Sequence, residues 1–382
     1  RSLFIFHLFW IFHVPSSFII FPVSLAMKFD VLTEEQQDLI IKVMGDFKIS
    51  VKNKDAVEFS RIGLKRGYNS AIHRVSLEDG RTFAVKITDA NQDAALNMLH
   101  NRELEFYSRL DQVKLEDSFD PDDISCLLQF YGGTRCEMEP GILIFNDLSN
   151  RLGQQPDYLI GYQPYVVFQV VKSIAAYQRV YLCTHEEFSI GRELVEYDAR
   201  RSIRKLDKIR WMSEEVKMCL REWAEPENLF AIQTEISERV EGISPVPVHC
   251  DLWSGNMIFE DIEGRFELLA ILDWATFKIG NPLIDIATML GKNMNTEDRR
   301  EYTSEILRLY TDEMLKRKDK FRKPFEITIE KAEILLSHAF RWACIQTMFA
   351  ILMSKDDRKE QGQEIGRLSI RLKELMNDVI GK

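Results

Sequence analysis

The chain has 382 residues, a formal net charge of −10 and an isoelectric point of about 5.4. Hydrophobic residues make up 45% of it and charged residues 29%, which is typical of a globular protein large enough to bury a core. The acidic balance disfavours nucleic acid as a partner. The six cysteines form no CxxC pair, which argues against a zinc site or a disulfide framework and favours a reducing, cytoplasmic location.

Residues 1–26 do not fit this picture. After the first residue they contain no Lys, Arg, Asp or Glu, and they are long enough to span a bilayer. Three interpretations are open: a secretory signal, a membrane anchor, or upstream sequence translated in error. Pro15 and Pro22 would interrupt a spanning helix, and Met27 begins the first polar stretch. We favour the third interpretation, expect the segment to lie outside the fold, and expect no stable membrane association unless it is retained.

The next part of the chain has the features of a small sheet with helices. Thr33, followed by Glu-Glu-Gln, predicts the capped start of a helix. Strands are predicted over 70–77 and 82–87, joined by the hairpin turn Glu-Asp-Gly-Arg. A helix is predicted over 91–110, and two further strands over 127–131 and 142–145.

After Leu148 the pattern becomes mainly helical. Helices are predicted over 165–182, 192–223, 227–240, 283–290, 296–316, 329–353 and 363–379. Short strands are predicted only over 246–248, 257–259 and 266–272. The sequence therefore predicts an α+β, two-lobed, protein-kinase-like fold, with a small antiparallel-sheet N-lobe over 27–148 and a larger helical C-lobe over 149–382.

A polar constellation follows the strand at 246–248. His249, Asp251 and Asn256 have the spacing H-x-D-x-x-x-x-N, and Asp273 ends an apolar strand seventeen residues after Asn256. Phosphoryl transfer needs a carboxylate to accept the proton of the attacking hydroxyl, and oxygen ligands to hold Mg²⁺ against the phosphates. We assign the first role to Asp251 and the second to Asn256 and Asp273.

These residues carry a family resemblance. Val-His-Cys-Asp-Leu-Trp-Ser-Gly-Asn and Ile-Leu-Asp-Trp resemble the aminoglycoside phosphotransferase–choline kinase superfamily, above all its CHK kinase-like (ecdysteroid-kinase-like) branch, which reads H-G-D-L-W-x-x-N and I-D-W. The resemblance covers most of the chain from about Met27. It implies that Asp251 is the catalytic base, that Asn256 and Asp273 bind the metal, and that His249 braces the loop. Cys250 replaces the usual glycine.

Asp285 also matches the family pattern. The resemblance implies that its carboxylate accepts backbone N–H bonds from the catalytic loop, although a plain charge at a helix start is the alternative. Only eleven residues separate Asp273 from Asp285. That leaves no room for the long activation segment of a protein kinase, which favours a small-molecule acceptor.

The nucleotide side is predicted in the first lobe. Lys86 lies in a strand that resembles the one carrying the phosphate-contacting lysine, and Glu103 of the next helix is its expected partner, ahead of Glu105. The remaining predicted contacts are a phosphate loop and the hinge between the lobes. They are Gly67, Asn69 and Ser70 in the loop, and Asn146 and Leu148 at the hinge, where relatives often have Glu-Asp-Leu.

The sequence thus predicts a small-molecule kinase that uses ATP and Mg²⁺ and transfers the γ-phosphate to an alcohol. The alcohol could be choline-like, a steroid or another hydroxyl compound. Aromatic residues of the helical lobe are candidates for lining its pocket: Trp211, Trp223, His338, Phe340, Trp342 and Phe349. Two alternatives stay open, an ATP-binding pseudokinase with a regulatory role and a membrane-anchored interaction protein.

Overall fold

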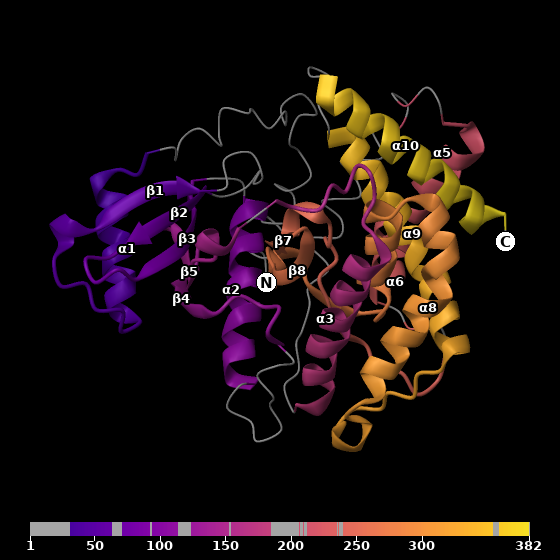
Figure 1. Ribbon diagram of the computed structural model, residues 1–382, viewed down its shortest axis with the longest axis horizontal. Helices are drawn as coiled ribbons and strands as arrows, with labels where there is room; N and C mark the ends of the chain where they lie inside the picture. The colour runs from indigo at the N-terminus through magenta and orange to yellow at the C-terminus, as the bar shows by residue number, and fades with distance from the viewer. Residues whose placement is uncertain are drawn as a thin grey trace, which may run out of the picture.

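The computed structural model describes residues 31–62, 71–91, 94–113, 124–152, 154–184, 206, 209, 212–234, 236, 240–353 and 359–381. In these residues a sheet lies at one end of the molecule and most helices lie at the other (Figure 1). The predicted two-lobed α+β fold is confirmed. The apolar segment 1–26 and the predicted phosphate loop lie outside the described residues.

Helix α1 (Glu34–Asp46) begins where its sequence predicts. The Thr33 hydroxyl accepts the Gln36 N–H, and the Gln36 side chain accepts the Thr33 N–H, which completes a capping box. Its apolar stripe, Ile40, Val43 and Met44, is buried in a cluster with side chains of the sheet. This cluster is the core of the outer half of the N-lobe.

The N-lobe sheet has five strands in the order β1-β2-β3-β5-β4, and every pairing is antiparallel. The strands are β1 (Glu58–Ile62), β2 (Ala71–Ser76), β3 (Thr82–Thr88), β4 (Phe130–Thr134) and β5 (Gly141–Asn146). Buried positions alternate along β2 and β3, because one face of the sheet packs on the core cluster. The β2–β3 turn uses Gly80 at a φ of 84°, which glycine adopts without strain.

Helix α2 (Ala94–Val113) follows β3 and lies between the sheet and the rest of the protein (Figure 1). Its residues Phe106, Tyr107 and Leu110 are buried in the large core that continues through the helical lobe. Because α2 packs on both lobes, its position controls how side chains of the sheet meet those of the helical lobe.

The helical lobe is built around α9. Its helices are α3 (Pro164–Cys183), α5 (Glu214–Trp223), α6 (Pro226–Thr234), α7 (Ile284–Thr288), α8 (Thr296–Leu315), α9 (Ile329–Met353) and α10 (Lys359–Ile380). Helix α3 packs on α8, and α9 packs on α7 and α10 (Figure 1). The length and apolar composition of α9 would allow it to cross a membrane, but 67% of its apolar window is buried inside the protein, as in a core helix.

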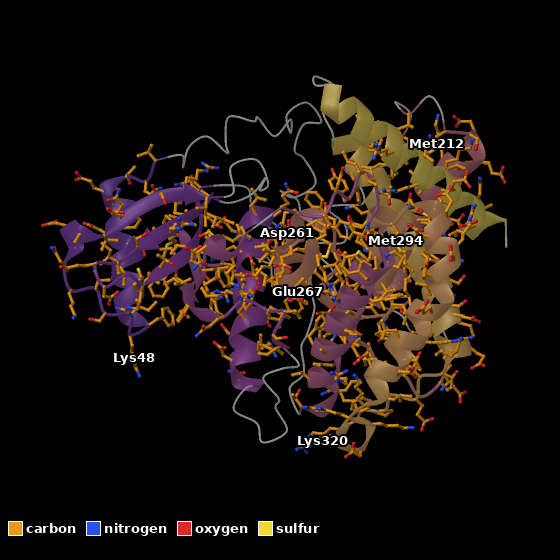
Figure 2. The ribbon with its side chains drawn as sticks, viewed as in Figure 1. Lys48, Met212, Asp261, Glu267, Met294 and Lys320 are labelled. Carbon is orange, nitrogen blue, oxygen red and sulfur yellow. The ribbon has the colours of Figure 1, made fainter. Side chains whose placement is uncertain are left out.

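Four short strands sit beside these helices. They are β6 (Val246–Val248), β7 (Met257–Ile262), β8 (Arg265–Ile271) and β9 (Lys278–Gly280), which pair antiparallel as β6–β9 and β7–β8. Asp261 and Glu267, labelled in Figure 2, mark the β7–β8 hairpin between the sheet and the helices. This places the ends of β6 and β8 at the junction of the two lobes.

Some elements differ from the prediction. Strands β1 and β9 were not predicted, because each is short and forms by pairing with another strand, which leaves no pattern in its own sequence. Helix α6 ends at Thr234, whereas the prediction continued it to Val240. The helix predicted over 283–290 is α-helical only as far as Thr288 and continues as a π-helical turn over Met289–Asn293.

Candidate active site

The loop after β6 is held by a buried carboxylate. Asp285 of α7 accepts the His249 N–H at 2.8 Å and the Cys250 N–H at 2.9 Å, and it also accepts the Tyr177 hydroxyl at 2.7 Å. Hydrogen bonds to a charged acceptor are strong where water is excluded. The predicted structural role of Asp285 is therefore confirmed, and the alternative of a plain helix-start charge is wrong.

His249 links this loop to the end of β8. Its Nδ1 accepts the Asp251 N–H at 3.2 Å, so the ring proton is on Nε2, which donates to the Leu272 carbonyl at 2.7 Å. One imidazole therefore fixes the loop that carries Asp251 against the residue that precedes Asp273. This geometry matches the bracing role predicted for His249.

Asn256 lies against Asp251. Its Nδ2 donates to the Asp251 carbonyl at 2.9 Å and to Asp251 Oδ2 at 3.2 Å. The Leu272 N–H donates to the Asn256 carbonyl at 2.8 Å, so the β7–β8 hairpin sets Asn256 opposite Leu272 and next to Asp273. Because Nδ2 makes the bonds to Asp251, the amide oxygen is the atom that can face a metal ion.

Lys86 joins the two lobes by two ion pairs. Its Nζ lies 2.5 Å from Glu103 Oε2 and 2.9 Å from Asp273 Oδ1. The Glu103 side chain is 3% exposed, whereas that of Asp273 is 47% exposed and open to a ligand. Glu105, the competing candidate, pairs instead with Arg109 at 2.8 Å. The chain thus brings β3, α2 and the end of β8 together at one ammonium group.

The charges of this cluster stabilise one another. Burial opposes the charge on Lys86, but the carboxylates of Asp273 and Glu103 outweigh it and raise the pKa of the lysine. Burial also opposes ionisation of Asp273, and there the attraction of Lys86 prevails and lowers the pKa of the carboxyl. At neutral pH the site therefore offers a fixed cation beside an ionised, ligand-accessible carboxylate.

An aromatic cluster that was not predicted braces the residues around Asp273. Trp274 stacks on Phe106 of α2 with ring centres 4.1 Å apart, and it meets Tyr177 and His249 edge-on at 4.9 and 4.8 Å. The rings come from four separate segments, so only the folded chain shows that they form one unit. The cluster joins α2 both to Trp274, the residue after Asp273, and to His249 in the loop after β6.

Cys250 adopts the backbone conformation for which relatives use glycine. Its φ is 65°, in the left-handed region that favours glycine. Its carbonyl accepts Trp342 Nε1 at 3.2 Å and Gln346 Nε2 at 3.0 Å, which fixes the peptide from the side of α9. The thiol is buried, and burial raises its pKa to about 12. The loop therefore accommodates the Cβ, as predicted.

At the hinge, Asn146 is hydrogen-bonded to the backbone of Gln129, the residue before β4. Its N–H donates to the Gln129 carbonyl at 3.0 Å, and its Oδ1 accepts the Gln129 N–H at 2.9 Å. Any adenine contact from Asn146 would therefore come from its carbonyl, not from its side chain. Leu148 caps the short 3₁₀ turn at Ser149–Arg151. Beside it, Asp147 Oδ2 pairs with Arg74 Nε at 2.9 Å.

The predicted phosphate-loop residues Gly67, Asn69 and Ser70 lie outside the described residues. The strands on either side of this loop are described, and Ile62 of β1 pairs with Ile72 of β2. Ile72 in turn pairs with Lys86 of β3. The ends of the loop therefore lie in β1 and β2, and β2 pairs with β3, the strand that carries Lys86.

The aromatic residues predicted to line an acceptor pocket face the protein's own cations. Trp211 lies outside the described residues, and His338 and Phe349 belong to α9. The other three rings have a cation near their centres: Lys278 at 5.8 Å from Trp342, Arg299 at 5.9 Å from Phe340, and Arg341 at 5.7 Å from Trp223. These contacts do not form an open aromatic cage.

The donor set suits Mg²⁺ better than a transition metal. Among the described residues no group of three or more His, Cys, Asp or Glu side chains could hold a metal ion. Magnesium needs only one or two protein oxygen ligands when phosphates and water complete its shell. The exposed Asp273 carboxylate and the Asn256 amide oxygen provide that pair.

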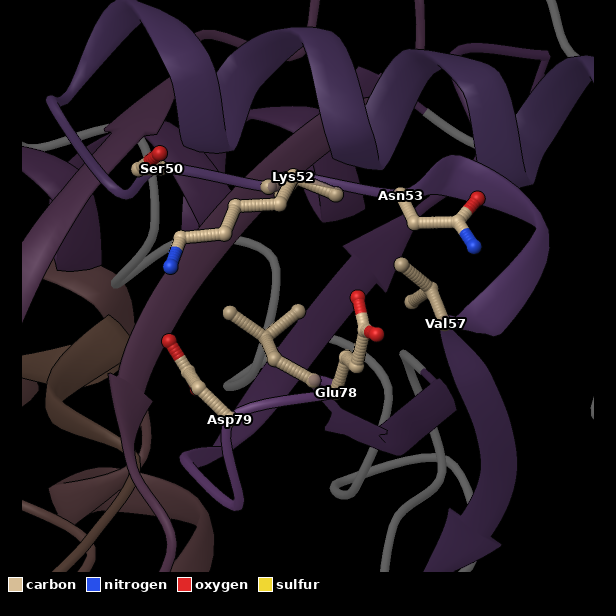
Figure 3. Close-up of a pocket in the computed structure, with 8 residues that line it drawn as sticks. Ser50, Lys52, Asn53, Val57, Glu78 and Asp79 are labelled. Carbon is tan, nitrogen blue, oxygen red and sulfur yellow. The ribbon is translucent and has the colours of Figure 1, made fainter.

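A separate hollow of about 260 Å³ lies on the N-lobe, between residues 50–57 and the turn after β2 (Figure 3). Its lining includes Ser50, Lys52, Glu78 and Asp79. None of its lining residues belongs to the predicted site.

A family profile described as "Uncharacterized oxidoreductase dhs-27" (DUF1679) matches residues 67–381 of the chain. The chain belongs to the DUF1679 family. No curated protein matches this DUF1679 chain in sequence. The match spans the loop after β6 and Asp273, so the residues of the candidate site lie within the family's matched region.

Solved structures of other proteins have a fold similar to that of this DUF1679 chain. A choline kinase from Cryptosporidium parvum Iowa II has a TM-score of 0.55 and 13% identity over 90% of this chain and 96% of its own. The ethanolamine kinase of Plasmodium vivax has a TM-score of 0.50 and 12% identity over 90% of both chains. A protein from Ralstonia eutropha JMP134, provisionally described as an aminoglycoside phosphotransferase, has a TM-score of 0.53 and 12% identity over 90% and 98%.

The word oxidoreductase in the DUF1679 description finds no support in the N-lobe. Nicotinamide dinucleotides bind to an open, mostly parallel sheet with helices on both faces. The five-stranded sheet described here is antiparallel at every pairing. The fold is that of the kinases named above.

Proposed function

We propose that this protein is an ATP-dependent phosphotransferase that moves the γ-phosphate to a hydroxyl group of a small molecule. One observation carries the proposal: the ion pairs Glu103–Lys86–Asp273 end beside the hydrogen-bonded pair Asp251–Asn256. A fixed cation, two metal-ligand candidates and a carboxylate base are the groups that phosphoryl transfer needs.

Each residue then has a defined role. Lys86 binds phosphate oxygens of the nucleotide, and Glu103 holds it in place. Asn256 and Asp273 hold Mg²⁺, which when bound neutralises charge on the phosphates. Asp251 orients the acceptor hydroxyl and accepts its proton as the oxygen attacks phosphorus. These assignments are proposals that rest on the distances given above and on the family resemblance.

The path from Asp273 to Asp285 supports a small acceptor. It consists of a 3₁₀ turn at Trp274–Thr276, strand β9 and the start of α7. The neighbours of known structure include enzymes named for choline and ethanolamine, which are small alcohols. Membership of the ecdysteroid-kinase-like branch remains part of the proposal, as do the domain boundary at 148/149 and a cytoplasmic location.

The charges near the catalytic loop favour an acceptor without a positive charge. Trp253 follows Asp251 by two residues in the loop, and Trp342 donates its Nε1 hydrogen to the Cys250 carbonyl. Lys292 lies 5.3 Å from the Trp253 ring, and Lys278 lies 5.8 Å from the Trp342 ring. An aromatic face that already meets an ammonium group is a poor cage for a quaternary ammonium ligand. A steroid or another uncharged alcohol therefore fits this side of the loop better than choline.

A screen of hydroxylated metabolites for ATP- and Mg²⁺-dependent phosphorylation tests the proposal. Choline and dimethylbutanol, its uncharged carbon analogue, form a matched pair within the screen. We expect an uncharged alcohol to be phosphorylated and the analogue to be used at least as well as choline. A clear preference for choline would contradict the charge argument alone. Nucleotide binding without any acceptor would instead favour the pseudokinase alternative.

A further inference from the structure

Helix α2 meets the segment that follows Asp273 along one face. Arg102 Nη2 donates to the Phe277 carbonyl at 2.5 Å, and its guanidinium lies 5.5 Å from the centre of the Phe277 ring. One turn further along α2, Phe106 stacks on Trp274 with planes inclined by only 3°. Residues four apart share a helix face, so the hydrogen bond and the stack act on the same side of α2.

The position of this face decides whether the ion pairs of the site can form. Glu103 follows Arg102 directly and lies 2.5 Å from Lys86, while Lys86 contacts Asp273, the residue before Trp274. Stacked rings resist separation but can slide in their common plane. A hydrogen bond to one carbonyl oxygen is directional and sets the register along the helix axis.

We infer that Arg102 is a positioning residue for the proposed phosphotransfer. It locks α2 to the segment that carries Asp273, and thereby holds Glu103 at the distance at which it pairs with Lys86. Arg102 itself touches neither nucleotide nor acceptor. The inference rests on the proposed function for its kinetic readout, but its structural readout is independent of any activity.

The chain offers a matched control. Arg135 and Arg102 both line a hollow of about 330 Å³ beside α2. Within the described part of the chain Arg135 pairs with Glu137, at 2.8 Å, and both of these side chains are mostly exposed. Removing the Arg135 guanidinium therefore changes the charge of the hollow by the same amount without touching the Phe277 carbonyl.

The test compares Arg102→Met, Arg102→Lys and Arg135→Met with the wild type. We expect Arg102→Met to weaken MgADP binding and to lower kcat, each by about tenfold, as for one charge-assisted hydrogen bond. The KM for the acceptor should stay within about twofold, because Arg102 acts on α2 and Phe277, whereas the acceptor is assigned to Asp251. Arg102→Lys should recover part of the loss, and Arg135→Met should behave as the wild type.

Hydrogen exchange supplies the second readout. We expect amides of 94–113 to lose protection in Arg102→Met and to keep it in Arg135→Met. Equal protection and equal MgADP affinity in these two variants would overturn the inference. If the wild type binds no nucleotide, the proposed function fails, and the exchange of α2 alone decides the role of Arg102. Should Arg102→Met not fold, Arg102→Lys provides the same comparison.

Discussion

Two residues of the candidate site hold a backbone conformation that most side chains avoid. Cys250 has a φ of 65° and Asp273 a φ of 60°. A left-handed conformation costs a non-glycine residue roughly 1 kcal/mol, and such strain is concentrated at functional sites. At Cys250 the cost is offset by the bonds from Asp285, Trp342 and Gln346. At Asp273 it turns the carboxylate towards Lys86.

Substitutions at Cys250 should therefore show whether the loop depends on its left-handed backbone conformation or on the thiol. We expect Cys250→Gly to keep turnover and to change the free energy of unfolding by less than about 1 kcal/mol, because relief of strain offsets the lost burial. Cys250→Val should cost about 2 kcal/mol or more, because a β-branched side chain is disfavoured at positive φ. Urea denaturation of both variants measures the difference, and equal stabilities would show that the loop is not strained.

The Asp285 carboxylate should contribute far more to the free energy of unfolding than the Tyr177 hydroxyl that donates to it. Asp285→Ala leaves the buried N–H groups of His249 and Cys250 and the Tyr177 hydroxyl without their acceptor, for which we expect a loss of about 3 to 5 kcal/mol. Tyr177→Phe removes one donor and keeps the ring packed on Trp274, so about 1 kcal/mol is expected. Similar losses in both variants, measured by denaturation, would contradict this account of the loop.

The residues of the candidate site were easier to find in the sequence than the contacts that support them. Spacing alone nominated Asp251, Asn256 and Asp273, because phosphoryl transfer restricts which residue types can stand there. The support consists of contacts such as Arg102 to Phe277, which are 175 residues apart and leave no local pattern. For the same reason the sequence could not show that the Asn146 side chain is used by the Gln129 backbone.

At the scale of elements, α2 is the part of the fold on which the site depends most. His100 fixes its N-terminal half to the sheet: Nε2 donates to the Thr134 carbonyl at 2.8 Å, and Nδ1 accepts the Thr88 hydroxyl at 3.0 Å. Burial lowers the pKa of His100 to about 4, with a small further contribution from the charge of Lys86. The imidazole is therefore neutral at physiological pH.

This histidine predicts how stability depends on pH. The folded protein binds the proton of His100 only near pH 4, whereas the unfolded chain binds it near 6.5, so stability falls as the pH drops through that window. The full loss is roughly 3 kcal/mol. Denaturation of the wild type and of His100→Gln should show a smaller loss for the variant between pH 6.5 and 4. Parallel pH profiles would mean that His100 is not buried as a neutral group.

Helices and strands with strong local patterns were predicted well. The capping box at Thr33 and the alternation along β2 and β3 are local signals, and each element forms where its signal lies. Strand β9 has three residues and exists because Lys278–Gly280 pairs with β6, thirty residues earlier in the chain. Pairing between such short strands leaves no periodic pattern of hydrophobic residues in the sequence.

At the scale of the whole molecule, the lobes share an apolar core and are joined by specific polar contacts. Besides Lys86–Asp273, Arg102 donates to the Phe277 carbonyl at 2.5 Å, and the Ile271 N–H donates to the Cys126 carbonyl at 2.8 Å. These contacts surround the ends of β6 and β8, where the predicted catalytic residues lie. A nucleotide bound there would contact both lobes, and at a hundred times its Kd it would stabilise the protein by about 2.7 kcal/mol.

The most direct test of the central claim is one comparison of Asp251→Asn with the wild type, using an acceptor found in the screen. We expect the variant to bind MgADP as the wild type does, because the proposed role of Asp251 is to bind the acceptor hydroxyl and not the nucleotide. Its turnover should fall by about a hundredfold or more, the contribution of a general base. Turnover equal to that of the wild type would contradict the assignment of Asp251 and, with it, the proposed mechanism.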